Sequence, residues 1–225
     1  YMLYTAYDGV IAQIAAASIK IDDFLNRRFD QWKRRGLAFE DIWDKDAIIF
    51  PEKIKGKYVI YHRIEPSIWV SYLDELEFPC PKDRHSIILG PRPGRMWDSL
   101  KIGAGTQPLK TKYGWLMIYH GVDQQRVYRL GSMLVDLNNP ERLIYRSPNP
   151  VLSPEMEYEV GKKGESWVPN VVFTCGAVPA EEKEILDAED ELIIYYGAAD
   201  THLCVGSATV GDLIPESIRR TYESK

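Results

Sequence analysis

The stretch Ile118-Tyr119-His120-Gly121-Val122-Asp123 has the pattern of a β-strand that ends in polar residues and a turn. Variants of this stretch occur at Leu3-Tyr4-Thr5-Ala6-Tyr7-Asp8, Ile60-Tyr61-His62-Arg63 and Tyr195-Tyr196-Gly197-Ala198-Ala199-Asp200. The tyrosines at the matching positions, Tyr4, Tyr61, Tyr119 and Tyr196, are 57, 58 and 77 residues apart. A repeat near this length that is built of short strands indicates a β-propeller, in which each repeat forms one blade.

Each repeat contains a series of short strands separated by turns. We expect strands at residues 47–54, 58–63 and 67–73 in the second repeat, at 104–109, 115–120, 128–135 and 143–146 in the third, and at 168–178, 192–197 and 203–210 in the fourth. A long acidic turn at residues 180–191 explains the longest spacing. Consecutive strands joined by turns pair antiparallel, and four of them make one blade. The sequence therefore predicts an all-β fold, with residues 1–225 forming a single β-propeller domain of about four blades.

The first repeat differs from the others at its beginning. The chain starts at Tyr1, inside a strand that has a preceding partner strand in the other repeats. A strand without its partner exposes a row of unpaired backbone groups. We therefore expect an incomplete domain, truncated at its N-terminal side, whose first blade lacks the leading strand. Such an open edge also favours pairing with another chain, as in a homo-oligomer.

The composition narrows the class of protein. Its 45% hydrophobic and 27% charged residues are typical of a soluble globular domain, and the net charge of −5 argues against a nucleic-acid partner. The longest apolar runs are too short to cross a bilayer, so no membrane partner is expected. The cysteines, Cys80, Cys175 and Cys204, show no paired spacing, which predicts reduced thiols and a cytoplasmic protein. The histidines lack the spacing of metal ligands, so we expect no metal and no cofactor.

Three segments lie outside the repeated strands. Residues 21–37 carry apolar side chains near helical spacing among charged ones, which predicts a short surface helix. The basic residues within this segment are expected on its solvated face. Residues 79–93 and 147–164 are rich in turn formers and are expected to be loops, where substrate contacts are common.

Polar residues recur at the ends of the predicted strands. These candidates are His62, Arg63, His120, Asp123 and Asp200 at or just after the repeated tyrosines, with Lys45, Asp46, Trp97 and Lys101 before the first strands of their repeats. The inner strands of a propeller point their ends at a central cavity. Arginine and lysine bind phosphate or carboxylate groups, and tryptophan packs on the apolar face of a sugar. The pattern thus predicts a site for a polar, negatively charged ligand.

Each candidate also has a purely structural explanation. The two strand-end histidines could be buried with satisfied hydrogen bonds, and Arg63 could pair with Glu65 on the surface. Trp97 could belong to the core, which is the usual place of a tryptophan. Asp123 and Asp200 could cap turns, as aspartate often does. The recurrence of these residues at equivalent points of successive repeats favours a shared site over these alternatives.

Several blocks of sequence occur in a fixed order along the chain. The first block is Asp44-Lys45-Asp46-Ala47-Ile48-Ile49-Phe50-Pro51-Glu52-Lys53-Ile54, followed by Gly56-Lys57-Tyr58, His62-Arg63 and Ser67-Ile68-Trp69-Val70. Further blocks are Trp97, Lys101-Ile102-Gly103-Ala104-Gly105-Thr106, Gly114-Trp115-Leu116, His120-Gly121, Tyr128-Arg129-Leu130-Gly131, Val168-Pro169-Asn170-Val171-Val172-Phe173 and Tyr195-Tyr196-Gly197-Ala198-Ala199-Asp200-Thr201. Together these blocks resemble glycoside hydrolase family 130, the mannoside phosphorylase family. The resemblance covers nearly the whole chain.

This resemblance implies a five-bladed β-propeller, present here as about four blades. It implies an enzyme that cleaves β-mannosides with inorganic phosphate to give α-mannose 1-phosphate with inversion, a glycosyltransferase-type phosphorylase reaction. By similarity, the phosphate-binding residues are Lys45, Arg63, Lys101, His120 and Tyr128. By the same similarity Asp200 binds the mannose that is transferred, and Trp97 forms a wall of the acceptor side. The expected partners are a β-mannoside oligosaccharide and phosphate.

The chain departs from the family pattern in one respect. The general acid of the family is the aspartate of a Glu-Asp-Pro-Arg motif, which does not occur in these 225 residues and would be expected upstream of Tyr1. The pairs Glu40-Asp41 and Glu189-Asp190 are not followed by Pro-Arg. We therefore expect residues 1–225 alone to be inactive. Two alternatives stay open: a β-mannosidase of the same family, with Asp46 as the nearest candidate base, and a non-catalytic carbohydrate-binding propeller.

Overall fold

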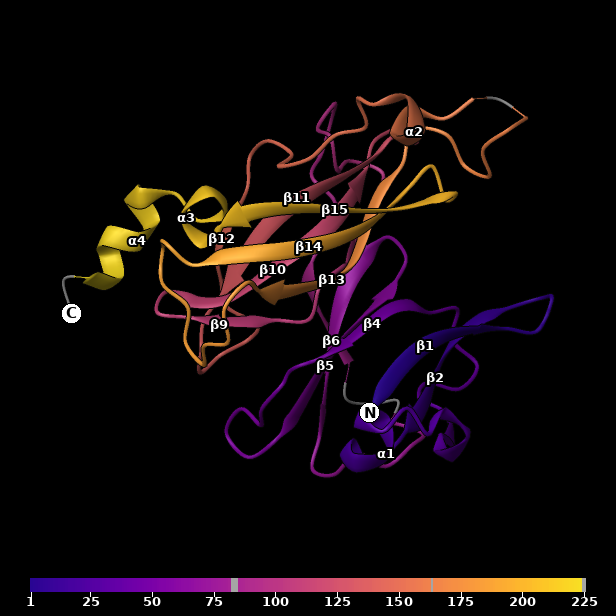
Figure 1. Cartoon of the computed structure of the whole chain (residues 1–225). Coiled ribbons are helices and arrows are strands. Elements are labelled where there is room, and N and C mark those ends of the chain that lie inside the picture. The colour runs from indigo at the N-terminus through magenta and orange to yellow at the C-terminus, as the bar shows by residue number, and fades with distance from the viewer. Residues whose placement is uncertain (82–84, 163, 224–225) are drawn as a thin grey trace.

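The computed structural model describes residues 1–81, 85–162 and 164–223, and it is built mostly of strands (Figure 1). The strands are β1 (Met2–Tyr7), β2 (Ala12–Ser18), β3 (Lys33–Leu37), β4 (Lys45–Ile49), β5 (Tyr58–Ile64), β6 (Ser67–Leu73), β7 (His85–Leu89), β8 (Lys101–Ala104), β9 (Leu109–Thr111), β10 (Gly114–Val122), β11 (Tyr128–Val135), β12 (Leu143–Arg146), β13 (Val172–Pro179), β14 (Glu191–Ala198) and β15 (His202–Thr209). The helices are α1 (Ile21–Leu25), the 3-10 turn η1 (Phe29–Gln31), α2 (Glu157–Val160), α3 (Val210–Leu213) and α4 (Glu216–Glu223). None of these helices is long and apolar enough to cross a membrane.

The described strands form four antiparallel sheets in a propeller-like arrangement, which confirms the predicted fold class. The sheets have the strand orders β1-β2-β3, β4-β5-β6-β7, β12-β11-β10-β8 with β9 beside β10, and β13-β14-β15. Tyr61, Tyr119 and Tyr196 are buried in β5, β10 and β14, each the second strand of its sheet in chain order apart from the short β9. Tyr4 lies instead in β1, which is paired with β2 and forms one edge of its sheet among the described residues. In three of the four repeats, the recurring tyrosine therefore marks the equivalent inner strand, as the spacing predicted.

Three predicted strands are confirmed with their full bounds, and one predicted strand is wrong. The strands expected at residues 67–73, 128–135 and 143–146 have these bounds in β6, β11 and β12. The strand expected at residues 104–109 is instead divided between β8 and β9. Thr106 lies in the gap, where its hydroxyl accepts the Ile118 N–H at 3.0 Å and its own N–H donates to the Ile118 carbonyl at 2.9 Å. Between β8 and β9, Thr106 thus provides hydrogen-bond partners for both the N–H and the carbonyl of Ile118 in β10.

The helix predicted over residues 21–37 is correct only for its first part. Arg27 adopts a left-handed backbone with φ of 57°, so the helical run does not continue as one element beyond α1. The last five residues form β3, which pairs with β2 from Ala15 to Ser18. Similarly, the loop predicted at residues 79–93 contains β7, which pairs with β6, while residues 82–84 of that prediction lie outside the described residues. In both cases the backbone groups of a neighbouring strand outweigh the local sequence pattern.

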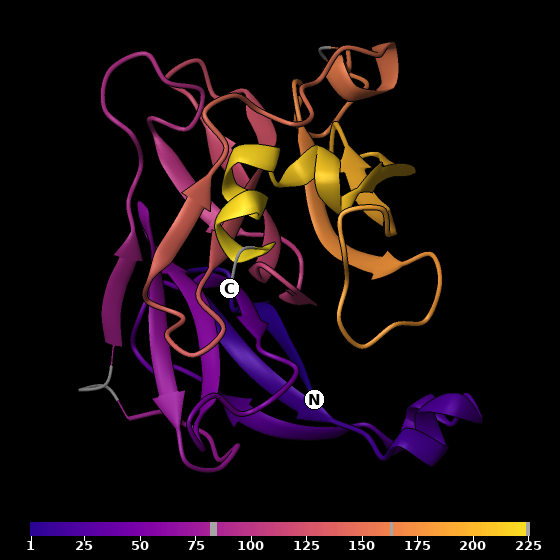
Figure 2. The same ribbon diagram turned by 90° about the vertical axis from the view of Figure 1, so that its left-hand side faces the viewer.

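The C-terminal helices were not predicted from the sequence. Thr209 caps α3, since its hydroxyl accepts the Asp212 N–H and donates to the Asp212 carboxylate. The segment then packs on the β8–β12 sheet, where the Ser132 hydroxyl donates to the Leu213 carbonyl at 2.8 Å. Ile218 of α4 packs against a hydrophobic cluster that includes Leu134 of β11 and Leu213 of α3. The two C-terminal helices therefore lie beside the β8–β12 sheet (Figure 2).

Trp97 forms a structural cover over two glycines of the β8–β12 sheet. A Cβ added at Gly121 would lie 2.5 Å from the Trp97 ring, and one added at Gly131 would also lie 2.5 Å from it. The indole N–H donates to the Pro148 carbonyl at 3.1 Å, which holds the ring in this place. The Trp97 ring therefore lies so close to the backbone of β10 and β11 that a residue larger than glycine does not fit at position 121 or 131.

We expect Gly121→Ala and Gly131→Ala each to lower the free energy of unfolding by about 1–3 kcal/mol, the usual cost of inserting a methyl group into a packed core. Gly206→Ala is the matched control, because Gly206 also lies in a strand but has nothing within 4 Å of the added Cβ. The control should change the free energy by less than about 0.5 kcal/mol. Urea unfolding of the three variants tests this, and equal effects at all three positions would contradict the packing argument.

Candidate functional site

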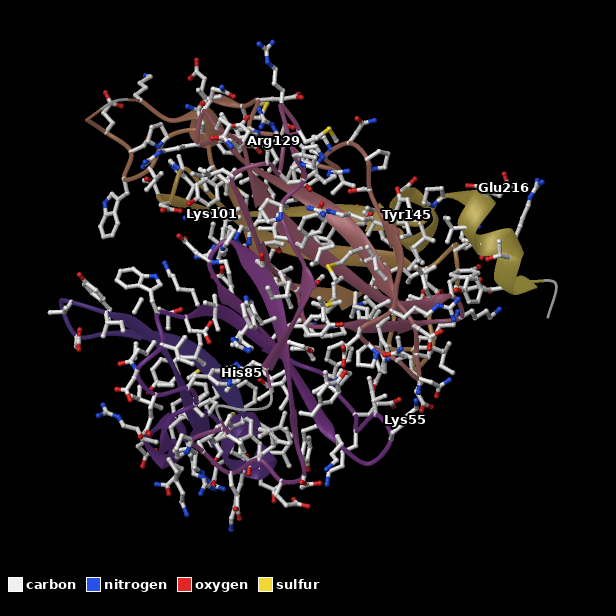
Figure 3. All side chains as sticks on the ribbon, turned by 180° about the vertical axis from the view of Figure 1, so that it is seen from behind. Lys55, His85, Lys101, Arg129, Tyr145 and Glu216 are labelled. Carbon is white, nitrogen blue, oxygen red and sulfur yellow. The ribbon has the colours of Figure 1, made fainter. Side chains whose placement is uncertain are left out.

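A cavity of about 390 Å³ lies where strand ends of three sheets meet. Its lining consists of Trp43, Lys45, Arg63, Glu65, Lys101, Tyr128, Val168, Val171, Phe173 and Asp200. Figure 3 labels Lys101, which lies on the side of the molecule where the β4–β7 sheet meets the β8–β12 sheet. Among the site residues predicted from the sequence, Lys45, Arg63, Lys101, Tyr128 and Asp200 are thus brought together on one cavity.

The three cations of the cavity are placed by strand pairing. Lys45 and Arg63 are direct partners in the β4–β5 register, so their side chains start from adjacent points. Lys101 begins β8 opposite Val122 of β10, next to the end of β5. The Lys101 ammonium lies 6.0 Å from the centre of the Tyr128 ring. The arrangement gives the cavity one guanidinium, two ammonium groups and a phenol, all of which can donate hydrogen bonds to an anion.

Arg63 is the most buried of these cations, with 4% of its side chain exposed. Its Nη1 lies 2.8 Å from Asp46 Oδ2 and donates to His120 Nε2 at 3.1 Å. Asp46 reaches this position because its backbone is left-handed, with φ of 54°, in an irregular part of the β4–β5 ladder. Gly103 is required below the group, since a Cβ there would lie 2.4 Å from His120 and 2.5 Å from Asp46. Asp46 and His120 therefore hold the guanidinium in one orientation, from the side away from the cavity.

His120 supports Arg63 and is not part of the cavity lining. Its side chain is fully buried, between Phe173 at 4.4 Å and Tyr128 at 6.1 Å, measured between ring centres. Burial lowers the pKa of His120 to about 4, although the Asp46 carboxylate acts in the opposite direction. The imidazole is therefore neutral near pH 7, and accepting from Arg63 at Nε2 assigns its proton to Nδ1. The structure thus places His120 as a support for the guanidinium.

His62 is a buried histidine with satisfied hydrogen bonds, as its structural explanation proposed. Its Nδ1 lies 2.6 Å from Asp44 Oδ2, and the Ser71 hydroxyl lies 3.3 Å from its Nε2. Phe39 stacks on the imidazole with ring centres 4.2 Å apart. The other oxygen of Asp44 accepts the Arg63 backbone N–H at 3.1 Å. The Asp44–His62 pair therefore fixes the end of β5 from which Arg63 projects.

The two carboxylates of the cavity lining differ in their surroundings. Glu65 lies 2.8 Å from the Lys101 ammonium and 3.6 Å from Arg63, and the hydrogen bond from Lys101 holds the pKa of Glu65 below its usual value. Asp200 lies in the turn after β14, with a left-handed φ of 50°. Burial raises the pKa of Asp200 above its usual value, and Lys45 opposes this shift. One carboxylate is thus paired with cations, and the other is partly desolvated.

Two further predicted residues lie away from the cavity. Trp97 is buried in a hydrophobic cluster with Ile102 and Tyr119, so its position matches the structural explanation and gives no support to an acceptor-side contact. Asp123 caps a turn by accepting the Gln125 and Val127 N–H groups, and it pairs with Arg129 at 2.6 Å. Neither belongs to the cavity lining.

Five lining residues were missed as candidates in the sequence, namely Trp43, Glu65, Val168, Val171 and Phe173. A signal was present for two of them. Trp43 precedes Lys45 by two residues, and Glu65 follows Arg63 by two. Since side chains alternate along an extended chain, residues two apart fall on the same face. The three apolar residues belong to the block at residues 168–173, which approaches Tyr128 because the Tyr128 N–H donates to the Asn170 carbonyl at 3.0 Å.

A family model and two relatives that match this chain are all described as phosphorylases of β-linked mannosides. A family model for glycoside hydrolase family 130, described as beta-1,4-mannooligosaccharide phosphorylase, matches residues 1–216. The 1,2-beta-oligomannan phosphorylase of Thermoanaerobacter sp. (strain X514) is 37% identical over 213 residues, which are 95% of this chain and 65% of the relative. The beta-1,2-mannobiose phosphorylase of the same strain is 41% identical over 206 residues, which are 91% of this chain and 61% of the relative.

A solved structure supports the same relationship. The beta-1,2-mannobiose phosphorylase from Listeria innocua, in complex with beta-1,2-mannobiose, superposes with a TM-score of 0.78 at 31% identity. The match covers 99% of this chain and 57% of that chain. The chain therefore spans less than two thirds of the length of these relatives.

The burial of His120 predicts a pH dependence of stability. Its pKa is about 4 in the folded protein and about 6.5 in an unfolded chain, so the unfolded state binds more protons between these values. The stabilising contribution of the neutral imidazole is complete above pH 6.5 and is lost as the pH falls towards 4. Over this range the free energy of unfolding falls by up to about 1.4 kcal/mol per pH unit.

His120→Gln tests this, because a glutamine oxygen can still accept from Arg63 but does not titrate. Urea unfolding between pH 4 and pH 7 should show a shallower pH dependence for this variant than for the unchanged chain. His202→Gln, at an exposed histidine of β15, is the control and should keep the slope of the unchanged chain. An identical slope for His120→Gln would show that His120 does not titrate as described.

Proposed function

The chain belongs to glycoside hydrolase family 130, and on that basis we propose that it forms the phosphate-binding part of a β-mannoside phosphorylase. The observation that carries the proposal is the convergence of Lys45, Arg63 and Lys101 with Tyr128 on one cavity. A cluster of fixed cations is suited to an anionic co-substrate, because each charge-assisted hydrogen bond contributes roughly 1.5–3 kcal/mol. Inorganic phosphate is the proposed co-substrate, with no metal or other cofactor.

Each cavity residue has a distinct part in this proposal. Arg63 presents a planar pair of donors whose direction is fixed by Asp46 and His120, so it orients the phosphate. Lys45 and Lys101 add positive charge on more flexible side chains. Tyr128 donates a hydrogen bond from its phenol. This set positions a nucleophilic oxygen, which is the main requirement for an in-line displacement.

The proposed reaction is a single inverting displacement. A phosphate oxygen forms a bond to the anomeric carbon of the mannosyl group while the bond from that carbon to the leaving sugar oxygen breaks. The leaving oxygen takes a proton from a general acid, and the product is α-mannose 1-phosphate. Asp200, whose raised pKa reflects its desolvation, is proposed to bind hydroxyls of the transferred mannose. We assign the general acid to no residue of this chain, since the Glu-Asp-Pro-Arg motif is absent from it.

The relatives favour one class of substrate within the family. The two relatives reported above, with 37% and 41% identity, are named for β-1,2-linked mannosides. The family model is described by β-1,4-linked mannooligosaccharides. We therefore propose β-1,2-linked oligomannosides as the substrate, with the β-1,4-linked compounds as the comparison.

The hydrolase alternative is less well supported by the geometry. Asp46, the carboxylate considered as a base for water, is 2.8 Å from Arg63 and only 9% exposed. A carboxylate that is buried against a guanidinium is not open to a substrate or to the water that it would have to activate. Cytoplasmic location and a homo-oligomeric state stay predictions from the sequence.

Phosphate binding can be tested without turnover. We expect inorganic phosphate to bind to the unchanged chain in isothermal titration calorimetry, and Lys101→Met to weaken binding at least about tenfold, because one charge-assisted contact is lost. Lys110→Met is the matched control, since Lys110 is exposed to the same degree and also pairs with a glutamate at 2.8 Å, but outside this cavity. A folded chain that binds no phosphate would contradict the proposal.

The reaction is tested with β-1,2-mannobiose and β-1,4-mannobiose, each with and without phosphate. Mannose 1-phosphate that forms only when phosphate is present establishes phosphorolysis, and faster reaction of the β-1,2 compound supports the proposed substrate. Release of free mannose without phosphate would favour the hydrolase. Phosphate binding without either product would agree with the absent general-acid motif and leave the cavity as a binding site in residues 1–225.

A further inference from the structure

Glu65 stands between two of the three cavity cations. Its Oε1 is 2.8 Å from the Lys101 ammonium and 3.6 Å from Arg63 Nη2. These are the groups that the proposed function assigns to phosphate. A carboxylate oxygen and a phosphate oxygen are equivalent acceptors for such donors, so the two anions compete for the same hydrogen bonds.

The carboxylate of Glu65 is free to leave this position. It lies in the turn between β5 and β6, and 47% of its side chain is exposed. A second cavity of about 330 Å³, lined in part by Pro66, Leu100 and Arg126, also has Glu65 and Lys101 in its wall. The side chain therefore separates two open spaces, and a rotation about its own bonds would carry the carboxylate away from Lys101.

Asp46 provides the contrast. It pairs with the same guanidinium, through Nη1, but only 9% of its side chain is exposed and it lies beside the buried His120. A carboxylate buried with its cation is costly to separate, whereas an exposed ion pair contributes little net free energy. Arg63 thus has a permanent carboxylate partner, Asp46, on its buried side and an exchangeable one, Glu65, on the side of the cavity.

We propose that Glu65 is an intramolecular competitor of phosphate, which occupies Lys101 and Arg63 in the empty site and must move aside when the anion binds. This inference rests on the proposed function, because it assumes that phosphate binds to these cations. It makes Glu65 a determinant of phosphate affinity: its negative charge weakens binding both by holding the donors and by repelling the incoming anion.

The test is the dissociation constant of inorganic phosphate, measured by isothermal titration calorimetry for the unchanged chain, Glu65→Gln and Glu65→Ala. We expect both variants to bind phosphate about twofold to fivefold more tightly, which corresponds to the free energy of an exposed ion pair. Thermal unfolding of each variant verifies that it is folded. The two variants differ in what remains of the side chain, so a common result reports the loss of the charge.

Glu52→Gln is the matched control. Glu52 pairs with Lys110 at 2.8 Å, with 49% of the glutamate and 25% of the lysine exposed, against 47% and 23% for Glu65 and Lys101. This ion pair lies outside the phosphate cavity, so the control should leave the dissociation constant unchanged. An equal gain in the control would show a general effect of net charge and would overturn the proposal.

The outcomes separate this inference from the proposed function. If the unchanged chain binds phosphate and both Glu65 variants bind it more tightly than the control, the competitor is supported. If the unchanged chain binds phosphate and the variants bind it equally or more weakly, Glu65 does not compete and the inference fails while the proposed function stands. If the unchanged chain binds no phosphate, the proposed function itself fails.

Discussion

The site depends on the buried ion pair between Arg63 and Asp46. A guanidinium removed from water is stable only where its charge is paired, and here Nη1 of Arg63 pairs with the Asp46 carboxylate and donates to His120. This leaves the outer side facing the cavity. The pair requires three features of the chain at one point: the left-handed backbone of Asp46, the missing side chain at Gly103, and a neutral His120. Each of these comes from a different strand, so the fold has to be complete here before the cation can be placed.

The sequence predicted the fold well because the repeated tyrosine is set by packing within each blade. It also predicted residues of the cavity. Arg63 was found from its place after a repeated tyrosine, Lys45 and Lys101 from their places before the first strands of their repeats, and Tyr128 from the family resemblance. It failed where long-range pairing decides the outcome. β3 and β7 carry no strong strand pattern of their own, yet each supplies hydrogen bonds to a neighbouring strand. The packing of Trp97 could not be predicted for a similar reason, because the two glycines that receive its ring are 24 and 34 positions away in the chain.

The carboxylates around the cavity form a graded series of burial, and this grading gives them different parts. Asp44 is fully buried and bonds the backbone of Arg63, so it fixes the strand. Asp46 is nearly buried and fixes the side chain. Glu65 and Asp200 line the cavity, where the first neutralises cations and the second is partly desolvated. The free energy needed to move each group away from its partners falls along this series. The deeper carboxylates therefore act as permanent supports, and the outer ones are open to exchange with a ligand.

The two strand-end histidines explain why a repeat alone does not assign function. His62 and His120 each follow the repeated tyrosine and occupy equivalent places in neighbouring sheets. His62 meets Asp44 and Ser71, so its ring is held by the scaffold and directed away from the cavity. His120 meets Arg63 and Asp46, because Gly103 of the adjacent strand leaves room for all three. The repeat fixes where a side chain starts, but the neighbouring strand determines what it contacts. The site therefore requires Gly103 on β8, since the side chain of any larger residue there would collide with His120 and Asp46.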